Sequence, residues 1–228
     1  MSVPGRRSVR RPVSFLGQEM ARFDLVIFDL DGTLVDSEGI SNRVLHRHLA
    51  ALGVPMTLDE VEAAFIGLSL PSCYQHIADT HGIVIDDAAF TPILQAETFA
   101  CYETELKPMP GVREALAAIT LPKCVASSSE RAKIAFSLRL TGLDGFFDDR
   151  IFSGREVANP KPAPDVFLHA AGVLGVDPAR CAVIEDSRFG IAAGMAAGMT
   201  VFAYRPHGDV PDSVRRFDDM AELPGFLF

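Results

Sequence analysis

The sequence has no tryptophan, and its 228 residues include only four cysteines. The cysteines lie at positions 73, 101, 124 and 181. They form no C-x-x-C pattern, so we expect neither a disulfide framework nor a zinc site. The six histidines also lack metal-ligand spacing, because His46 and His48 are two positions apart and would point to different faces of a helix. The sequence therefore predicts reduced cysteines and no histidine-ligated metal.

Long apolar runs and an excess of positive charge are also missing. No run approaches the ~20 apolar residues that a membrane-spanning helix needs. The formal net charge of -9 argues against nucleic acid and anionic membranes as partners. It leaves an anionic small substrate open, because local cations decide the field at a site. We therefore expect a cytoplasmic protein that binds no nucleic acid and no membrane. We also expect a monomer, since no coiled-coil or swapping pattern is present.

The basic N-terminal segment, residues 1–20, needs a separate explanation. It carries four arginines and one glutamate, but it lacks the apolar stretch and the cleavage site of an export signal. Because it offers almost no apolar side chain to bury, we predict a flexible N-terminal extension, with the working fold beginning near Met20.

What the sequence does contain is an alternation of short apolar runs with helical stretches. The runs that suit buried strands of a parallel sheet are residues 23–28, 123–126, 182–184 and 200–203. The helical stretches between the later runs are about residues 112–119, 131–140, 164–174 and 189–197. This alternation predicts an α/β fold, a Rossmann-like doubly wound parallel sheet with helices on both faces. Gly190, Gly194 and Gly198 are spaced by four, which marks the last helix as packed closely on the sheet, with no chemistry to assign.

Residues 37–105 differ, because they show helical patterns and no convincing buried strand. Leu45, Leu49 and Leu52 have the spacing of one helix face. Further helices are expected from the capping-box spacing of residues 57–60, and over residues 71–80 and 86–105. We therefore predict an all-helical cap domain over this segment, inserted between residues 21–36 and 106–228 of the α/β core. Its two connections at one edge suit a lid over a site, and a purely structural subdomain is the alternative.

Two carboxylates follow the first apolar run, in the segment Asp29-Leu30-Asp31-Gly32-Thr33. They could belong to a helix cap or a calcium loop, but the later ligands of an EF-hand loop are missing. Ligands of doubly wound sheets bind at the carboxyl ends of the strands, where Asp29 could attack phosphorus and Asp31 could transfer protons. Gly32 permits a tight turn, and Thr33 offers a hydroxyl and a backbone N–H to phosphate oxygens.

Three further signals lie at later strand ends. Ser127 closes the run 123–126, where it suits either phosphate binding or capping of the helix that follows. Lys161 stands between two prolines, so a stiff backbone would hold its charge in place for phosphate. Glu185 and Asp186 end another run, and carboxylate oxygens are the preferred ligands of Mg²⁺. Each signal is weak alone, but the four together, in this order and at strand ends, are specific.

With these four motifs, the sequence resembles the haloacid dehalogenase superfamily of phosphatases and phosphomutases from about residue 23 to residue 203. The place and size of the expected helical cap agree with that family. The chain looks closest to the β-phosphoglucomutase-like branch, through residues 33–37, 161–165 and 185–191. Within that branch it resembles bacterial sugar-phosphate phosphatases of the 6-phosphogluconate type. The resemblance implies a Mg²⁺-dependent phosphatase acting on a small phosphorylated metabolite, a sugar or sugar-acid phosphate.

The resemblance also implies a role for each motif residue. Asp29 would be the nucleophile that forms a phospho-aspartate, and Asp31 would be the general acid and base. The implied ligands of Mg²⁺ are Asp29, the main-chain carbonyl of Asp31, and Asp186, with Glu185 beside it. The implied phosphate-binding residues are Thr33, Ser127 and Lys161. These roles agree with the chemistry, because phosphoryl transfer depends mainly on positioning and on neutralising the phosphate oxygens.

Three other functions stay open. A β-phosphoglucomutase-type phosphomutase would share all four motifs, but Leu70 stands where the mutases' cap has an Arg, and Ser41 where it has a His. Arg43 or Arg47 could supply the missing cation. A haloacid dehalogenase would need neither the metal nor the second aspartate of the first motif, so the presence of Asp31 and Asp186 speaks against it. A non-catalytic binding protein should have lost some of the charged motif residues.

Overall fold

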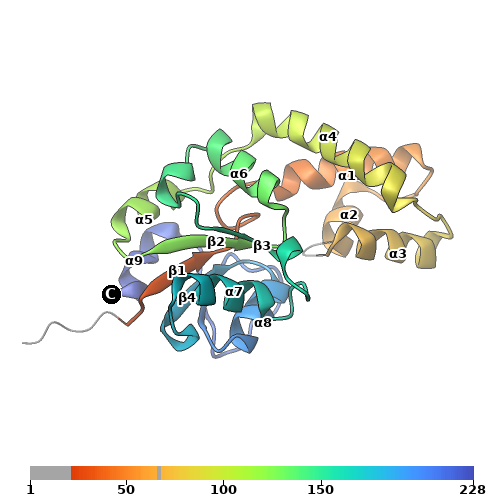
Figure 1. Ribbon diagram of the computed structural model, residues 1–228. Coiled ribbons are helices and arrows are strands. Elements are labelled where there is room, and N and C mark those ends of the chain that lie inside the picture. The colour runs from red at the N-terminus through yellow and green to blue at the C-terminus, as the bar shows by residue number, and fades with distance from the viewer. Residues whose placement is uncertain (1–21, 66–67) are drawn as a thin grey trace, which may run out of the picture.

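The computed structural model describes residues 22–65 and 68–228 (Figure 1). The predicted N-terminal extension over residues 1–20 and the predicted start near Met20 lie outside the described residues. All four cysteines are free thiols, as the sequence predicted. Among the described residues, no helix combines the length and the apolar character that crossing a membrane requires.

A six-stranded sheet with only parallel strand pairs forms the centre of the core, in the order β3-β2-β1-β4-β5-β6. The strands are β1 (Leu25–Phe28), β2 (Lys123–Ser127), β3 (Ile151–Ser153), β4 (Cys181–Glu185), β5 (Thr200–Tyr204) and β6 (Arg215–Phe217). The four strands expected from apolar runs are all present. The sequence did not predict β3 and β6, because each has only three residues and β6 buries only Phe217.

Helices cover both faces of the sheet (Figure 1). Val26 and Phe28 of β1 pack with the helices of one face, and Leu25 and Ile27 with those of the other. The first face holds α5 (Val112–Ala118), α6 (Arg131–Leu140) and α9 (Pro224–Leu227), and the second holds α7 (Asp165–Leu174) and α8 (Arg188–Ala196). Short 3-10 helices are η1 (Asp144–Phe146), η2 (Gly154–Glu156), η3 (Pro178–Arg180) and η4 (Met220–Glu222). Because β1, β2, β4 and β5 are buried on both sides, their sequences are apolar runs.

The order of the strands reverses between β1 and β4. From β1 the chain continues through β2 to β3 on one side of the sheet, and then returns to place β4 on the other side of β1. Ligands of doubly wound sheets bind beyond the carboxyl ends of the strands at such a reversal. Asp29 directly follows β1 and Glu185 ends β4, so two of the four motifs lie at this point.

The described residues between 37 and 105 form four helices and no strand. These are α1 (Glu38–Ala51), α2 (Leu58–Phe65), α3 (Leu70–His81) and α4 (Asp87–Glu105), which lie together beside the sheet (Figure 1). They enclose a hydrophobic cluster of their own that includes Leu45 and Leu49. Leu52 was expected on that same face, but this prediction is wrong, because the helix ends before it and its side chain is 44% exposed. The predicted fold class, an α/β sheet with an inserted helical cap, is confirmed.

The three glycines spaced by four in α8 and just after it differ in their surroundings. A Cβ atom at Gly194 would lie 2.7 Å from Cγ2 of Val201, so this glycine allows the close packing that the sequence predicted. Gly198 has a φ of +73° and no such close neighbour, so it serves to end the helix. Gly190 lies against a carboxylate of the site. The packing interpretation is therefore right for Gly194 and for Gly190, which lets α8 approach Glu185 of β4, and it is wrong for Gly198. For Gly190 the sequence missed only the link to the site.

Candidate active site

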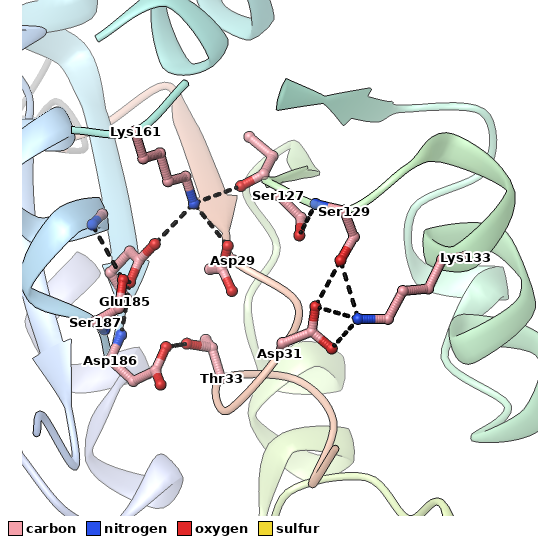
Figure 2. Close-up of polar contacts among 12 residues, drawn as sticks. Asp29, Asp31, Thr33, Ser127, Ser129, Lys133, Lys161, Glu185, Asp186 and Ser187 are labelled. Carbon is pink, nitrogen blue, oxygen red and sulfur yellow. Dashed lines mark hydrogen bonds and ion pairs between the residues drawn. The ribbon is translucent and has the colours of Figure 1, made fainter. Parts of the chain in front are cut away.

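Lys161 joins the carboxyl ends of three neighbouring strands (Figure 2). Its Nζ donates to Oδ1 of Asp29 at 2.6 Å, to Oε1 of Glu185 at 2.7 Å and to the carbonyl oxygen of Ala126 at 3.1 Å. Asp29 directly follows β1, Glu185 is the last residue of β4, and Ala126 belongs to β2. The ammonium group also lies 4.7 Å from the ring centroid of Phe167, and only 4% of the Lys161 side chain is exposed. The predicted fixed cation is thus present, and it faces the predicted nucleophile.

Glu185 is fully buried and fully hydrogen-bonded. Its Oε1 accepts from Lys161, and its Oε2 accepts from the backbone N–H groups of Asp186 and Ser187 and from the Ser187 hydroxyl. A Cβ atom at position 190 would lie 1.6 Å from Oε1, so only glycine leaves room for this carboxylate. Glu185 therefore fixes the position of the Lys161 ammonium group, and the absence of a side chain at Gly190 leaves the space that the Glu185 carboxylate occupies.

Replacing Gly190 with Ala should push the Glu185 carboxylate away from Lys161. We expect a loss of about 1–3 kcal/mol in the free energy of unfolding from overpacking, together with a large loss of activity. Thermal unfolding and turnover measure the two effects. The control is Gly172→Ala on α7, where a Cβ would meet no atom within 4 Å and the change should stabilise the helix by about 1 kcal/mol. Equal melting temperatures for the two variants would contradict the assignment.

Asp31 accepts hydrogen bonds from three side chains, and Figure 2 shows two of them, Ser129 and Lys133. The Ser37 hydroxyl donates to Oδ1 at 2.6 Å and the Ser129 hydroxyl to Oδ2 at 2.8 Å. Nζ of Lys133 lies 3.0 Å from both carboxylate oxygens and also donates to Oγ of Ser129. Burial alone would raise the pKa of Asp31, but the charge of Lys133 and these hydrogen bonds outweigh it and lower the pKa below its usual value. The sequence did not point to Lys133 or to the Ser37 hydroxyl, and it suggested Ser129 only as part of the run 127–129, for phosphate binding or helix capping.

Thr33 and Asp186 lie together at the reversal of the sheet (Figure 2). The Thr33 hydroxyl, fully buried, donates to Oδ1 of Asp186 at 3.0 Å. The other oxygen, Oδ2, is buried without a hydrogen-bond partner, and a Cβ at Gly32 would lie 2.2 Å from it. Gly32 has a φ of +78°, which agrees with the tight turn that the sequence predicted. The hydroxyl of Thr33 thus orients Asp186, while its expected contact with phosphate stays a prediction.

Ser127 ends β2 and is buried. Its Oγ accepts from the backbone N–H of Ser129 at 3.1 Å, inside the turn that precedes α6. The residue at the helix boundary is Glu130, and α6 begins at Arg131, so Ser127 is not the helix cap that the sequence offered as an alternative. Its hydroxyl lies at the same sheet edge as Asp29, and its role toward phosphate stays a prediction.

Buried negative charge exceeds buried positive charge at this edge. Burial raises the pKa of Asp29 to about 7, against the lowering effect of Lys161, and the charge of Glu185 raises it further. Burial also raises the pKa of Asp186, with contributions from Glu185 and Asp29. The pKa of Lys161 lies above its usual value, since the two carboxylates outweigh the effect of burial. Three buried carboxylates, of Asp29, Glu185 and Asp186, therefore lie at an edge where Lys161 supplies one buried ammonium group.

This excess charge and the unpartnered Oδ2 of Asp186 fit a divalent cation. Oxygen ligands and a local surplus of negative charge are what Mg²⁺ requires. Asp186 also belongs to a second group of side chains in the described residues that could hold a metal ion. Ligand atoms of Glu38, Asp186 and His207 all lie within 4.8 Å of one another. In it, Nε2 of His207 and Oε2 of Glu38 lie at hydrogen-bond distance, 3.1 Å apart. The sequence gave no sign of this group, because its members are far apart in the chain.

Comparison with known proteins agrees with this geometry. The family described as haloacid dehalogenase-like hydrolase matches residues 23–198. The 6-phosphogluconate phosphatase of Escherichia coli is 32% identical over 209 residues, covering 90% of this chain and 95% of that protein. The fructose-1-phosphate phosphatase of Escherichia coli is 30% identical over 179 residues, covering 78% and 94%.

Solved structures show the same relationship. A haloacid dehalogenase family hydrolase from Deinococcus radiodurans, with bound phosphate and sodium, has a TM-score of 0.72 and 34% identity, covering 91% of this chain and 99% of that one. A conserved haloacid dehalogenase-like protein of unknown function from Agrobacterium tumefaciens has a TM-score of 0.78 and 31% identity, covering 90% and 97%. The chain therefore belongs to the haloacid dehalogenase-like hydrolase family, as its four motifs predicted, and it is an enzyme of the phosphatase type.

Proposed function

We propose that this enzyme is a Mg²⁺-dependent phosphatase that hydrolyses a small sugar or sugar-acid phosphate through a phospho-aspartate on Asp29. The observation that carries the proposal is the environment of Asp29 at the end of β1. Its Oδ1 is paired with Lys161, and in the described residues no hydrogen bond engages Oδ2. The side chain keeps 10% of its surface exposed, so the second oxygen can reach a substrate. The named activities of the relatives support the substrate class.

The residues suit a reaction in two steps. Asp31 must first take up a proton, because its pKa is lowered in the free enzyme. In the first step, an oxygen of Asp29 bonds to phosphorus as the bond to the ester oxygen breaks, and the protonated Asp31 gives its proton to the departing alcohol. In the second, Asp31 takes a proton from water, the water oxygen bonds to phosphorus, and the bond to Asp29 breaks to release phosphate. Lys161 holds Asp29 in position and neutralises charge on the transferring group.

Asp29, the main-chain carbonyl of Asp31, and Asp186 are the residues that would hold Mg²⁺. When bound, the cation would neutralise charge on the carboxylates and on the phosphate oxygens. Thr33 would keep Asp186 turned toward the site, because its hydroxyl already donates to Oδ1. The helices of residues 37–105, which we propose as the cap domain, would close over this edge and select the leaving group.

The phosphomutase alternative finds little support in the cap. Such an enzyme needs a cation to hold a second phosphate, and Arg43 and Arg47 were the candidates. Both are paired with carboxylates of α4: Arg43 with Glu105 and Arg47 with Glu97. The hydroxyl of Ser41, where the mutases have a His, is hydrogen-bonded to that of Tyr102 at 2.8 Å. Hydrolysis by water therefore remains the better supported outcome.

The test is Mg²⁺-dependent release of phosphate from a panel that includes 6-phosphogluconate, fructose 1-phosphate and β-glucose 1-phosphate. We expect turnover of at least one ester, and its loss when EDTA is added. Chelator-resistant turnover would overturn the metal-dependent mechanism, and no release from any ester would favour a binding protein. With β-glucose 1-phosphate and a trace of glucose 1,6-bisphosphate, glucose 6-phosphate forming faster than free phosphate would establish the mutase instead.

Mg²⁺ should stabilise the enzyme more at pH 8 than at pH 5.5. The pKa of Asp29 is raised to about 7 in the folded protein. Between about pH 4 and pH 7, the folded protein therefore keeps a proton on Asp29, whereas the unfolded chain has lost it. Without metal, this group therefore lowers stability as pH rises through that window. Mg²⁺ needs the carboxylate form, so its binding should raise the melting temperature by about 5–10 °C at about 100 times its Kd at pH 8.

At pH 5.5 the same Mg²⁺ concentration should give a smaller rise, because the cation must displace a proton. Sodium chloride of equal ionic strength is the control for general screening. Asp186→Asn should reduce the rise at both pH values, since it replaces a proposed ligand oxygen. An equal rise at the two pH values would show that the buried carboxylates do not hold the cation.

A further inference from the structure

Neither the dipole of its helix nor exposure to solvent accounts for the position of Lys133. It is the third residue of α6, in the first turn, where the helix dipole disfavours a cation. Its side chain is only 24% exposed, and its one ion pair among the described residues is with Asp31. It follows Ser129 by four positions, so both side chains can reach the same carboxylate. The position of this lysine is therefore explained by Asp31.

The cap domain limits the freedom of Lys133 on its other side. Nζ lies 5.8 Å from the centroid of the Tyr102 ring, which α4 supplies. The Tyr102 side chain is itself buried, and its hydroxyl is fixed by the hydrogen bond to Ser41 on α1. Lys133 is thus confined between the core carboxylate and an aromatic face, an arrangement that favours a single position for the ammonium group.

We propose that Lys133 is a positioning residue for Asp31, which it orients toward the leaving oxygen of the substrate together with Ser129. The inference rests on the proposed function, in which Asp31 protonates the departing alcohol. When Asp31 gives up its proton as the phosphorus–oxygen bond breaks, the carboxylate that forms has the ammonium group 3.0 Å from both oxygens. In the part of the chain that the structure describes, the hydrogen bonds of Lys133 go to Asp31 and Ser129 and not to Asp29, so its main contribution should be to proton transfer.

This role predicts a dependence on the leaving group. An alkoxide is a poor leaving group and needs the proton, whereas p-nitrophenolate leaves without one. The value of kcat/KM reports the steps up to the departure of the first product, so it isolates the step in which Asp31 acts as an acid. For Lys133→Met, kcat/KM for the alkyl ester should fall by about 10²–10³-fold, and for p-nitrophenyl phosphate by less than about tenfold. The alkyl ester is 6-phosphogluconate or fructose 1-phosphate, whichever the native enzyme hydrolyses faster.

Two further variants separate this role from a structural one. Lys123→Met is the matched control, because its ammonium group donates to the carbonyls of Ile119 and Leu121 at the opposite end of β2. Lys123→Met should leave kcat/KM unchanged for both substrates. Ser129→Ala removes one donor to Asp31 without changing the charge, and it should give a smaller loss, again larger for the alkyl ester. This variant also tests the inference if Lys133→Met folds poorly.

A double-mutant cycle completes the experiment. Once Asp31→Asn has removed the proton transfer, adding Lys133→Met should lower kcat/KM for the alkyl ester no further, because both changes affect one step. Additive losses, or equal losses for the alkyl and aryl esters, would overturn the inference, and so would an unchanged kcat/KM. Failure of the native enzyme to release phosphate from any ester would instead contradict the proposed function.

Discussion

Asp29→Asn is expected to lower turnover by about 10⁴–10⁶-fold, the scale seen when a catalytic nucleophile is removed. An amide oxygen cannot form the acyl phosphate, and it is a weaker ligand for Mg²⁺ than a carboxylate. The folded structure should persist, because Asn is nearly the same size and removes a buried charge that repels Glu185. We expect the melting temperature without metal to be equal to that of the native enzyme or higher. Phosphate release under single-turnover conditions measures the loss.

The matched control for this variant is Asp24→Asn. Asp24 lies at the opposite end of β1, is exposed and forms an ion pair with Arg180, so the same chemical change there should leave turnover nearly unchanged. Incubation with substrate and acid quenching offers a second measurement, because phosphate should become covalently attached to the native chain and not to the chain that carries Asp29→Asn. A variant with a near-normal rate would show that the nucleophile lies elsewhere.

Lys161→Met should have the second largest effect, because it affects both stability and catalysis. Removing the ammonium group leaves Asp29 and Glu185 without their shared partner in a buried site. Breaking a buried ion pair in this way costs about 3–5 kcal/mol. If Lys161 neutralises the transferring phosphate as proposed, loss of its charge should lower kcat by at least about 10²–10³-fold. Unfolding in EDTA and turnover in Mg²⁺ measure the two effects separately.

The two effects can be separated by a second substitution. Adding Glu185→Gln to Lys161→Met removes one of the two unpaired carboxylates, so part of the lost stability should return while activity should not. Lys123→Met again serves as the control, since that lysine bonds only main-chain carbonyls in the described residues. If stability and activity recovered together, Lys161 would act only as a structural support.

Local sequence patterns were sufficient for the parts of the fold that are continuous in the chain. Strands buried on both faces are apolar runs, and so β1, β2, β4 and β5 could be predicted, whereas β3 and β6 are too short to produce such a signal. The capping box that starts α2 also forms, since the N–H groups of Thr57 and Glu60 each bond the other residue's side chain. The prediction for Leu52 was wrong because its spacing matched one face of α1, but the residue lies just beyond the end of that helix.

Contacts between distant residues could not be predicted in the same way. Three of the four motifs could be located because each ends or directly follows a strand, and a parallel sheet brings such ends together. Lys161 lies in the loop between η2 and α7, and its two flanking prolines marked it instead. Lys133 reaches Asp31 across 102 positions, and His207 reaches Glu38 across 169, so no local spacing indicates either pair. The direction of the Thr33 hydroxyl, and the space that Gly190 leaves for Glu185, likewise depend on which side chain the fold places opposite.

Ser37, the first residue of the proposed cap domain, shows a conflict between local stability and the site. A serine before a helix normally accepts a hydrogen bond from the backbone of the first turn, which contributes about 1 kcal/mol. Ser37 precedes α1 but makes no such bond, and its hydroxyl donates to Asp31 instead. A change that turned the Ser37 side chain toward the backbone of the helix would therefore move its hydroxyl away from Asp31, the proposed acid and base. Thermostable variants selected in this segment should tend to be slower enzymes, a trade-off located in one side chain.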